Sequence, residues 1–317
     1  MEKFGKVIVK LRIPILILSF LLLIPSAIGY FNTRVNYDIL YYLPNEIETM
    51  QGQDILMDDF NKGAYAMVVV QNMDTKSTDR LIKKVENVDH VAQVISYTGI
   101  GGEDVPSEIV PSKFRKYFEN DSTDTTLFAI FFDNTTSSDD TMNAIIQIRE
   151  QTEGQAFISG MSAVVTDTKN LSEKETPLYV LIAVVLVCIV LAIFMDSFLV
   201  PVFFMISIGM AIVYNLGSNI LLGEVSYITK ALAAVLQLGV TLDYSIFLWH
   251  SYKEMKEIYP DDHKEAMAVA ISNTLTSVVG SSITTVAGFI ALCFMSFTLG
   301  LDLGIVMAKG VVFGVIG

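Results

Sequence analysis

The stretch LQLGVTLDYSIFLWHSYKE, residues 236–254, is the part of the sequence that decides the fold. Most of it reads as a membrane-spanning helix, yet it carries an aspartate, Asp243, near its middle. On translocon insertion scales, an Asp at the centre of a spanning helix costs about 2.5–3.5 kcal/mol, so such a residue usually faces the bundle interior and has a partner or a task. The stretch therefore predicts a membrane protein with a functional carboxylate in one helix.

The composition also indicates a membrane protein. Of the 317 residues, 52% are hydrophobic and 17% are charged, and the mean hydropathy is +0.51. The apolar residues form long runs, and about 20 of them in succession cross a bilayer as a helix. Five runs are long enough, at residues 13–31, 178–195, 198–222, 225–249 and 268–299. A sixth begins near Leu301 and is still apolar at Gly317. We therefore expect an α-helical polytopic membrane protein with a six-helix half bundle whose last helix is incomplete, in a truncated chain or one half of a larger protein.

Residues 32–176 form a separate predicted domain between residues 1–31 and residues 177–317. The segment has no spanning run, and it contains 12 Lys or Arg against 24 Asp or Glu, so it carries nearly all of the formal charge of −13. Stretches rich in β-branched and aromatic residues predict strands at residues 65–72, 91–98, 125–134 and 156–160. Helical patterns at residues 77–87, 107–119 and 138–153 lie between them, and a last helix, 161–175, leads into the second run. This alternation predicts an α/β ferredoxin-like domain.

The basic residues predict the orientation of the chain in the membrane. They precede the first run, as Lys3, Lys6, Lys10 and Arg12, and lie between the fourth and fifth runs, as Lys253, Lys256 and Lys264. Under the positive-inside rule both segments are cytoplasmic, so residues 32–176 are expected outside a multi-pass protein of the cell membrane. The first run exceeds the roughly 7–15 apolar residues of a signal peptide, and we expect it to remain as an anchor.

Several other functional classes are disfavoured. Both cysteines, Cys188 and Cys293, fall in membrane runs, which leaves the external domain without a disulfide framework or a zinc site. The acidic balance argues against nucleic-acid binding, which needs a concentrated basic surface. The external domain has a single histidine, His90, and no Gly-rich phosphate loop after a strand. We therefore expect no enzyme and no metal or cofactor site.

Asp243 is the candidate centre of function. Membrane-buried carboxyl groups mark ion and proton pathways. The hydroxyl of the adjacent Tyr244 can donate to the carboxylate or relay a proton, and Gly239, one turn earlier, permits the close approach of a neighbouring helix. The sequence therefore predicts a proton relay at Asp243 and Tyr244, with the alternative that Asp243 only bonds across helices or lines a packing interface.

The same stretch resembles a known family motif. GVTLDYSIFLWHSYKE is similar to the fourth-helix motif of the MMPL family of the resistance-nodulation-division superfamily. The matching positions are Gly239, Asp243, Tyr244, Phe247, Tyr252 and Lys253. The layout also resembles the N-terminal half of such a protein: one helix, an external porter domain, and a block of five helices.

The resemblance implies a proton-driven exporter of lipidic or amphiphilic molecules. In the family, protons flow through Asp-Tyr pairs on the fourth and tenth helices, so the resemblance assigns the relay to Asp243 and Tyr244, with the proton as coupling ion. The implied partners are membrane lipids or a lipid-like substrate and a second transporter half, fused or associated. A homo-oligomer is compatible with this assignment.

Other polar residues in the membrane runs are candidates for supporting the carboxylate. Ser281 and Thr285 belong to a stripe of small and polar residues on the fifth run, which either faces the fourth helix or is a packing surface. Lys309 lies about eight residues into the sixth run, roughly 12 Å deep. It either pairs with Asp243, directly or through water, or extends its amine to the membrane interface.

Two functional classes remain open. A proton-coupled exporter requires a titrating carboxylate. A non-transporting sensor or assembly scaffold, similar to sterol-sensing-domain proteins, would use the same helix architecture without a proton cycle. The Asp243–Tyr244 pair favours the exporter.

Overall fold

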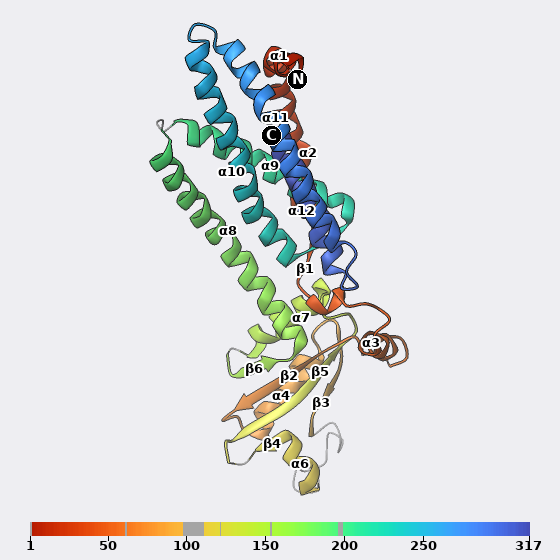
Figure 1. Cartoon of the computed structure of the whole chain (residues 1–317). Coiled ribbons are helices and arrows are strands. Elements are labelled where there is room, and N and C mark those ends of the chain that lie inside the picture. The colour runs from red at the N-terminus through yellow and green to blue at the C-terminus, as the bar shows by residue number, and fades with distance from the viewer. Residues whose placement is uncertain (1, 61, 98–110, 121, 153, 196–198) are drawn as a thin grey trace. The chain divides into compact units, whose positions relative to one another are not determined.

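The computed structural model describes the chain except for residues 1, 61, 98–110, 121, 153 and 196–198 (Figure 1). The chain divides into two compact units. One comprises Met1–Asn36 with Lys174–Gly317 and holds the membrane helices; the other is Tyr37–Glu173 and holds the main sheet.

Six of the described helices are long and apolar enough to cross a membrane, which confirms the predicted spans. They are α2 (Arg12–Asn32), α8 (Met161–Phe194), α9 (Leu199–Gly217), α10 (Tyr227–Ile258), α11 (His263–Leu292) and α12 (Leu299–Ile316). The helix predicted at 161–175 is continuous with the second span, so that α8 runs for 34 residues through Pro177.

Polar residues at the helix starts determine where two of these helices begin. The Ser226 hydroxyl accepts from the backbone N–H of Ile228 at the start of α10. The Asp262 carboxylate accepts from the N–H groups of Lys264 and Glu265 at the start of α11. Each cap satisfies N–H groups that a helix cannot bond internally.

The membrane helices pack through small residues. A Cβ on Gly29 of α2 would collide with the carbonyl oxygen of Gly217 in α9, so the two backbones touch. A Cβ on Gly304 of α12 would lie 2.6 Å from the carbonyl oxygen of Phe289 in α11. Helices in lipid associate through such close contacts, because burying apolar side chains gains little there.

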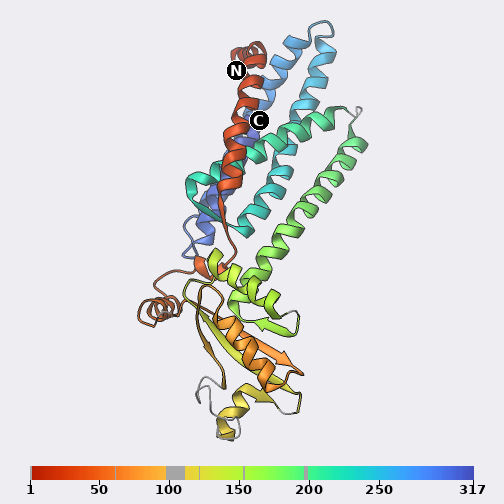
Figure 2. The same ribbon diagram turned by 180° about the vertical axis from the view of Figure 1, so that it is seen from behind.

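The two basic segments of the membrane unit lie side by side. A short helix, α1 (Glu2–Lys10), packs on α11 (Figure 2). Lys6 forms an ion pair with Glu265 at 2.7 Å. Beyond the other end of α2, β1 (Arg34–Asn36) pairs in parallel with β7 (Glu224–Ser226), which precedes α10. The N-terminal segment is thus attached to the helix block at both ends of α2.

The external unit contains an antiparallel sheet in the order β3-β5-β2-β6. Its strands are β2 (Ala64–Gln71), β3 (Val91–Ile95), β5 (Thr125–Phe132) and β6 (Ala156–Ser159), and the two-residue β4 (Glu119–Asn120) extends β5. Helices α4 (Thr75–Glu86) and α7 (Asp139–Thr152) connect β2 to β3 and β5 to β6. Two such crossovers interleaved in one antiparallel sheet are the ferredoxin-like arrangement, which confirms the predicted fold.

The core of this unit follows the strand alternation. Val68 and Val70 of β2 and Phe128 of β5 are buried, and Ile145 of α7 and Val85 of α4 pack against them. One face of the sheet is therefore covered by both helices, in keeping with the period of two along a strand.

Two parts of the external unit differ from expectation or lie outside the described residues. The helix predicted at 107–119 is observed as α6 (Ser112–Phe118), and residues 107–110 of that prediction are not among the described residues. A further helix, α3 (Glu48–Asp58), was not predicted. None of its residues is buried, and Ile55, Leu56 and Met57 are consecutive, so they do not form the i, i+3, i+4 pattern that marks a helix.

Phe128→Ala should destabilise the external unit by about 3–5 kcal/mol, because the ring is fully buried and its removal leaves a cavity. Hydrogen exchange of the backbone amides of β2 and β5, followed in urea on the purified chain, measures the loss. Phe157→Ala is the matched control, since that ring is 63% exposed. Equal losses for the two variants would contradict the assignment of the core.

Candidate functional site

Helix α10 carries the predicted relay and has two distinct faces. Its buried residues are Thr229, Ala233, Ala234, Gln237, Leu238, Thr241 and Tyr244. Gly239 and Asp243 lie on the opposite, exposed face with Phe247. The predicted site residues are therefore divided between the inside and the outside of the bundle.

Asp243 and Tyr244 are neighbours in sequence but point in different directions. Successive residues of an α-helix are about 100° apart around the axis. Tyr244 is 9% exposed and points into the bundle, whereas Asp243 is exposed. Among the described residues, no hydrogen bond or ion pair engages the Asp243 carboxylate. The structure thus presents an unpaired carboxylate on the outer surface of a membrane helix.

Gly239 leaves the surface beside Asp243 open. A Cβ built on this glycine would meet no described atom within 4 Å. The glycine therefore does not serve contacts within the described chain. It leaves room next to Asp243 for another helix to approach closely.

Ser281 and Thr285 do not reach the carboxylate in the described structure. The hydroxyls of Thr284 and Thr285 donate to the carbonyl oxygen of Ser281, at 2.7 and 3.0 Å, and so bond within α11. Ser281 is exposed and Thr285 is half-buried. A Cβ on Gly288, in the same stripe, would meet nothing within 4 Å. At Ser281 and Gly288 the stripe is therefore open, and no hydrogen bond joins Ser281 or Thr285 to Asp243 among the described residues.

Lys309, expected either to pair with Asp243 or to extend its amine to the interface, has a partner within the helix block. Its ammonium donates to Asn219 Oδ1 at 2.5 Å, and no direct pair with Asp243 is formed among the described residues. Helices α10 and α12 run in the same direction, because Gly310 approaches Gln237 and Gly314 approaches Thr241. Lys309 therefore lies near the level of Gln237, roughly 10 Å along the axis from Asp243.

The prediction overlooked Asp302, which organises the start of α10. Its Oδ2 accepts from the backbone N–H of Ser226 at 2.8 Å and from the hydroxyl of Thr229 at 2.6 Å. Asp302 also lies within electrostatic range of Lys309, two turns further along α12. An acidic residue inside the apolar sixth run was the available signal, since a charge there needs partners.

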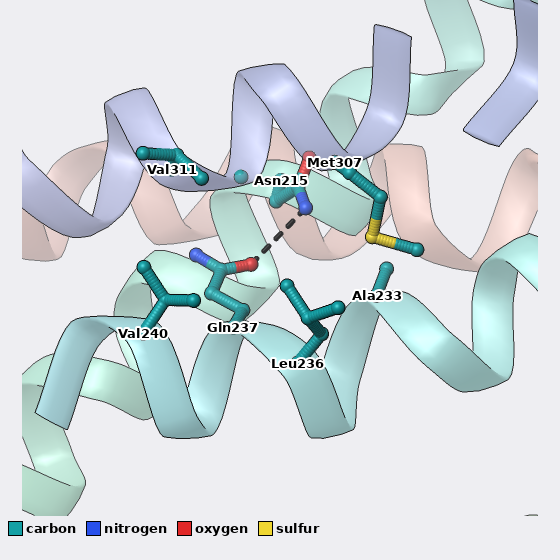
Figure 3. Close-up of a pocket in the computed structure, with 8 residues that line it drawn as sticks. Asn215, Ala233, Leu236, Gln237, Val240, Met307 and Val311 are labelled. Atoms are coloured by element: carbon teal, nitrogen blue, oxygen red, sulfur yellow. Dashed lines mark hydrogen bonds between the residues drawn. The ribbon is translucent and has the colours of Figure 1, made fainter. Parts of the chain in front are cut away.

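A pair of buried amides joins α9 and α10 (Figure 3). Asn215 Nδ2 donates to Gln237 Oε1 at 3.0 Å, and the two residues are 0% and 4% exposed. Both stand in otherwise apolar runs, which was the signal that could have identified them. Their bond lies in the interior of the bundle, beside α12.

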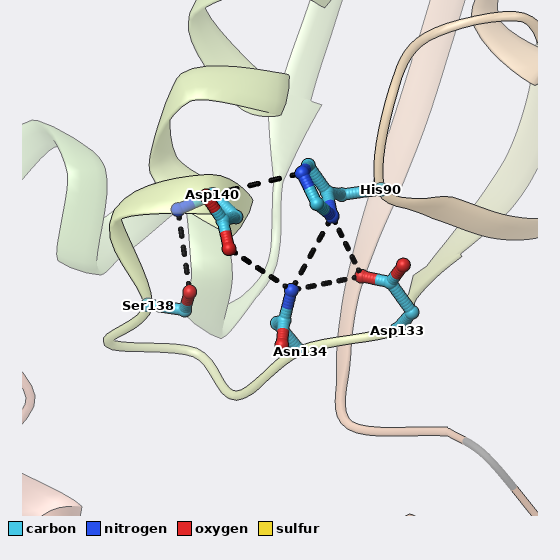
Figure 4. Close-up of polar contacts among 5 residues, drawn as sticks. All are labelled: His90, Asp133, Asn134, Ser138 and Asp140. Carbon is cyan, nitrogen blue, oxygen red and sulfur yellow. Dashed lines mark hydrogen bonds and ion pairs between the residues drawn. The ribbon is translucent and has the colours of Figure 1, made fainter.

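The external unit has a polar cluster around His90 (Figure 4). His90 Nδ1 lies 3.3 Å from Asp133 Oδ1, and Nε2 lies 3.8 Å from Asp140 Oδ1. Asn134 Nδ2 donates to both carboxylates, at 3.0 and 3.3 Å. The cluster ties the residue before β3 to the end of β5 and the start of α7. Within the described ranges, no group of three or more His, Cys, Asp or Glu side chains is arranged to hold a metal ion.

Comparison with known proteins gives one family. Residues 42–317 match the family model described as "MMPL family". The apo-petrobactin exporter of Bacillus anthracis is 20% identical over 325 aligned residues, covering 98% of this chain and 42% of the exporter. A putative membrane protein of Methanocaldococcus jannaschii is 25% identical over 219 residues, covering 67% of this chain and 56% of that protein.

A further relative matches a shorter part of the chain, and a solved structure aligns with most of it. A putative membrane protein of Streptomyces coelicolor is 36% identical over 118 residues, which are 35% of this chain and 16% of that protein. A crystal structure of SecDF in its super-membrane-facing form aligns with a TM-score of 0.45 and 14% identity, covering 95% of this chain and 36% of that one. The chain spans about half the length, or less, of the curated relatives that it matches.

Asp302→Ala should lower the stability of the helix block by about 1–3 kcal/mol, because the Ser226 N–H and the Thr229 hydroxyl lose their acceptor. Asp302→Asn keeps an acceptor oxygen and should lose less. Thermal unfolding of the purified chain in detergent measures both. Asp243→Ala is the control, because that carboxylate has no partner among the described residues. A loss for Asp243→Ala as large as that for Asp302→Ala would contradict this account.

Proposed function

Because the chain belongs to the MMPL family, we propose that it acts as the N-terminal half of a proton-driven exporter, with Asp243 as the residue that takes up and releases the coupling proton. The observation that carries the proposal is the position of Asp243, which lies on the exposed face of a membrane helix with no polar partner among the described residues. The family match and the exporter from Bacillus anthracis support a role in transport.

The energetics of the membrane explain why such a carboxylate suits a proton carrier. An ionised Asp in the apolar layer is unfavourable by a few kcal/mol, and protonation removes most of this cost. The two protonation states of Asp243 therefore prefer different surroundings. A change of protonation can then shift the equilibrium between two arrangements of the helices, which is the basis of coupling.

Tyr244 extends the proposed relay into the bundle. Its side chain points to the inner face of α10, on the same face as Thr241 and Gln237. A tyrosine hydroxyl both donates and accepts a hydrogen bond. In the proposal, Asp243 exchanges the proton at the outer surface of the bundle, and Tyr244 connects that surface to the interior.

The open surface around Asp243 indicates what the complete transporter must supply. A polar helix surface in a membrane requires a matching polar or small-residue surface. Gly239 and Asp243 on α10, and Ser281 on α11, present such a surface, and it is not covered within the described chain. We therefore assign its covering to a second transporter half, fused or associated, and the exporter from Bacillus anthracis supports this, because 98% of this chain aligns with only 42% of that protein.

The substrate and orientation follow from the same proposal. The substrate class is lipidic or amphiphilic, and it reaches the external unit from the membrane. Helices α2 and α8 suit this route, because little of either is buried within the described structure, so both are open to lipid. The basic segments at α1 and between α10 and α11 lie together, as they must if both face the cytoplasm. The proposal places residues 32–176 outside the cell membrane and needs no cofactor besides the proton.

Asp243→Asn should abolish proton uptake into proteoliposomes that hold the complete transporter, because an amide cannot exchange the coupling proton. The measurement follows the internal pH after an acidic jump outside, with protein amount and orientation matched between samples. Asp261→Asn is the control, since it makes the same change in the exposed connection between α10 and α11. Uptake should fall to that of empty vesicles for Asp243→Asn and stay at the wild-type rate for Asp261→Asn.

The opposite result would favour the non-transporting alternative. If the wild type and Asp243→Asn are equally silent, or equally leaky, the carboxylate carries no coupling proton. A sensor or assembly scaffold of the sterol-sensing-domain type would then explain the helix architecture better.

A further inference from the structure

The buried amide pair of α9 and α10 leaves two polar atoms without partners. Asn215 Nδ2 donates to Gln237 Oε1, but Asn215 Oδ1 and Gln237 Nε2 have no hydrogen-bond partner among the described residues. Both atoms are fully buried. A buried polar group without a partner costs about 1–3 kcal/mol, so two of them on one contact require an explanation.

A small cavity lies next to these amides (Figure 3). Its lining is apolar except for Asn215 and Gln237, and it includes Leu236 and Val240 of α10 and Met307 of α12. The space is about 10 Å³, which corresponds to one water molecule. The two residues that carry the unpaired atoms therefore both line the cavity.

The hydrogen-bonding groups identify the ligand. The unpaired atoms are one carbonyl acceptor and one amide donor, and a water molecule can satisfy both at once. If both amides were turned over, Gln237 would donate to Asn215, and again one acceptor and one donor would remain. A metal cation would leave the amide N–H groups unpaired, and an anion would face the carbonyl oxygen. Only a ligand that both donates and accepts fits either arrangement.

Gly310 of α12 keeps this space open. A Cβ at Gly310 would lie 2.6 Å from Asn215 Nδ2 and 3.3 Å from Gln237 Oε1. An alanine at this position would press on the amide pair and remove the room beside it. Gly209 of α9 offers the opposite case, because a Cβ there would meet nothing within 4 Å.

We propose that Asn215 and Gln237 bind one internal water molecule between α9, α10 and α12, and that this water belongs to the proton path. The second part rests on the proposed function. Gln237, Thr241 and Tyr244 follow one another at intervals of four and three residues on the inner face of α10. The Thr241 hydroxyl, also buried, has no partner among the described residues. The bound water lies at the head of this polar line, which leads to the relay tyrosine.

The structure of the complete transporter, determined at a resolution that shows ordered water, tests the site directly. We expect a density peak within about 3.2 Å of both amide side chains, at Asn215 and Gln237, in the wild type and in Gly209→Ala. The peak should be absent in Gly310→Ala. An empty cavity in the wild type, or amides that pair fully with other protein groups, would overturn the proposal.

Thermal stability provides a second test if the Gly310→Ala protein does not fold. Gln237→Met alone leaves the whole Asn215 amide without its protein partner, whereas Asn215→Leu with Gln237→Met removes every group that the water serves. The double variant should therefore be more stable than Gln237→Met, because hydrocarbon side chains need no water there. Asn215→Leu alone completes the comparison, and a double variant that loses the sum of the two single losses would contradict a bridged pair.

Proton uptake by the same variants tests the role in the path. Gly310→Ala should slow uptake relative to Gly209→Ala, since only the former displaces the water. If the water is seen but uptake is unchanged, its assignment to the path is wrong and the binding site stands. If the wild type takes up no protons at all, the proposed function fails, while the density still decides whether the site exists.

Discussion

The packing of the membrane helices depends on one constraint: a polar group buried among apolar side chains costs free energy unless it has a hydrogen-bond partner. The Asp302 carboxylate has such partners, because it accepts from the Ser226 N–H and the Thr229 hydroxyl at the start of α10. The Lys309 ammonium likewise has a partner, because it donates to the side-chain oxygen of Asn219. These bonds fix the contacts of α12 with the start of α10 and with the segment that follows α9, because shifting α12 would leave a donor or acceptor unpaired. Asp243 differs, since no such contact holds it.

This difference distinguishes polar residues with a structural role from Asp243, to which we assign the coupling proton. Asp302 and Asp243 are both acidic residues in membrane helices, and sequence alone gives them the same cost. One is tied to the backbone and side chains of a neighbouring helix, and the other lies on an outer face beside an open glycine. A carboxylate without a polar partner among the described residues can change its protonation state without breaking a described hydrogen bond or ion pair. That freedom is what the proposed coupling requires.

Much of the fold could be predicted, because the signals are local. Runs of about 20 apolar residues predict spanning helices, and the alternation in β2 and β5 predicts a sheet with one buried face. Partners between elements could not be predicted in the same way. In the sequence, Lys309 lies about eight residues into its run and Asp243 lies at a comparable distance from the other face of the membrane, which leaves open whether the two charges meet. With α10 and α12 parallel, the two charges lie at different levels, and Lys309 reaches Asn219. The hydrogen bond between Asn215 and Gln237 was not predicted either, because both side chains are uncharged and therefore less conspicuous than Asp243 or Lys309 in an apolar run.

The inner and outer faces of α10 have different roles in the proposed mechanism. The inner face has Thr229 bonded to Asp302 and Gln237 bonded to Asn215, and both bonds hold α10 to a neighbouring helix. The outer face has Asp243 and Gly239, and nothing in the described chain restrains it. A protonation change at Asp243 therefore alters the contact between the outer face of α10 and the proposed second transporter half. The hydrogen bonds on the inner face of α10 are not directly affected. A helix held firmly on one side and free on the other would move with its block and would not unfold, and such movement could be passed along the connecting helices to the external unit. Hydrogen bonds along Gln237, Thr241 and Tyr244 on the inner face would then have to break and re-form as α10 moves. A hydrogen bond made through water re-forms more easily than a direct one between two amides.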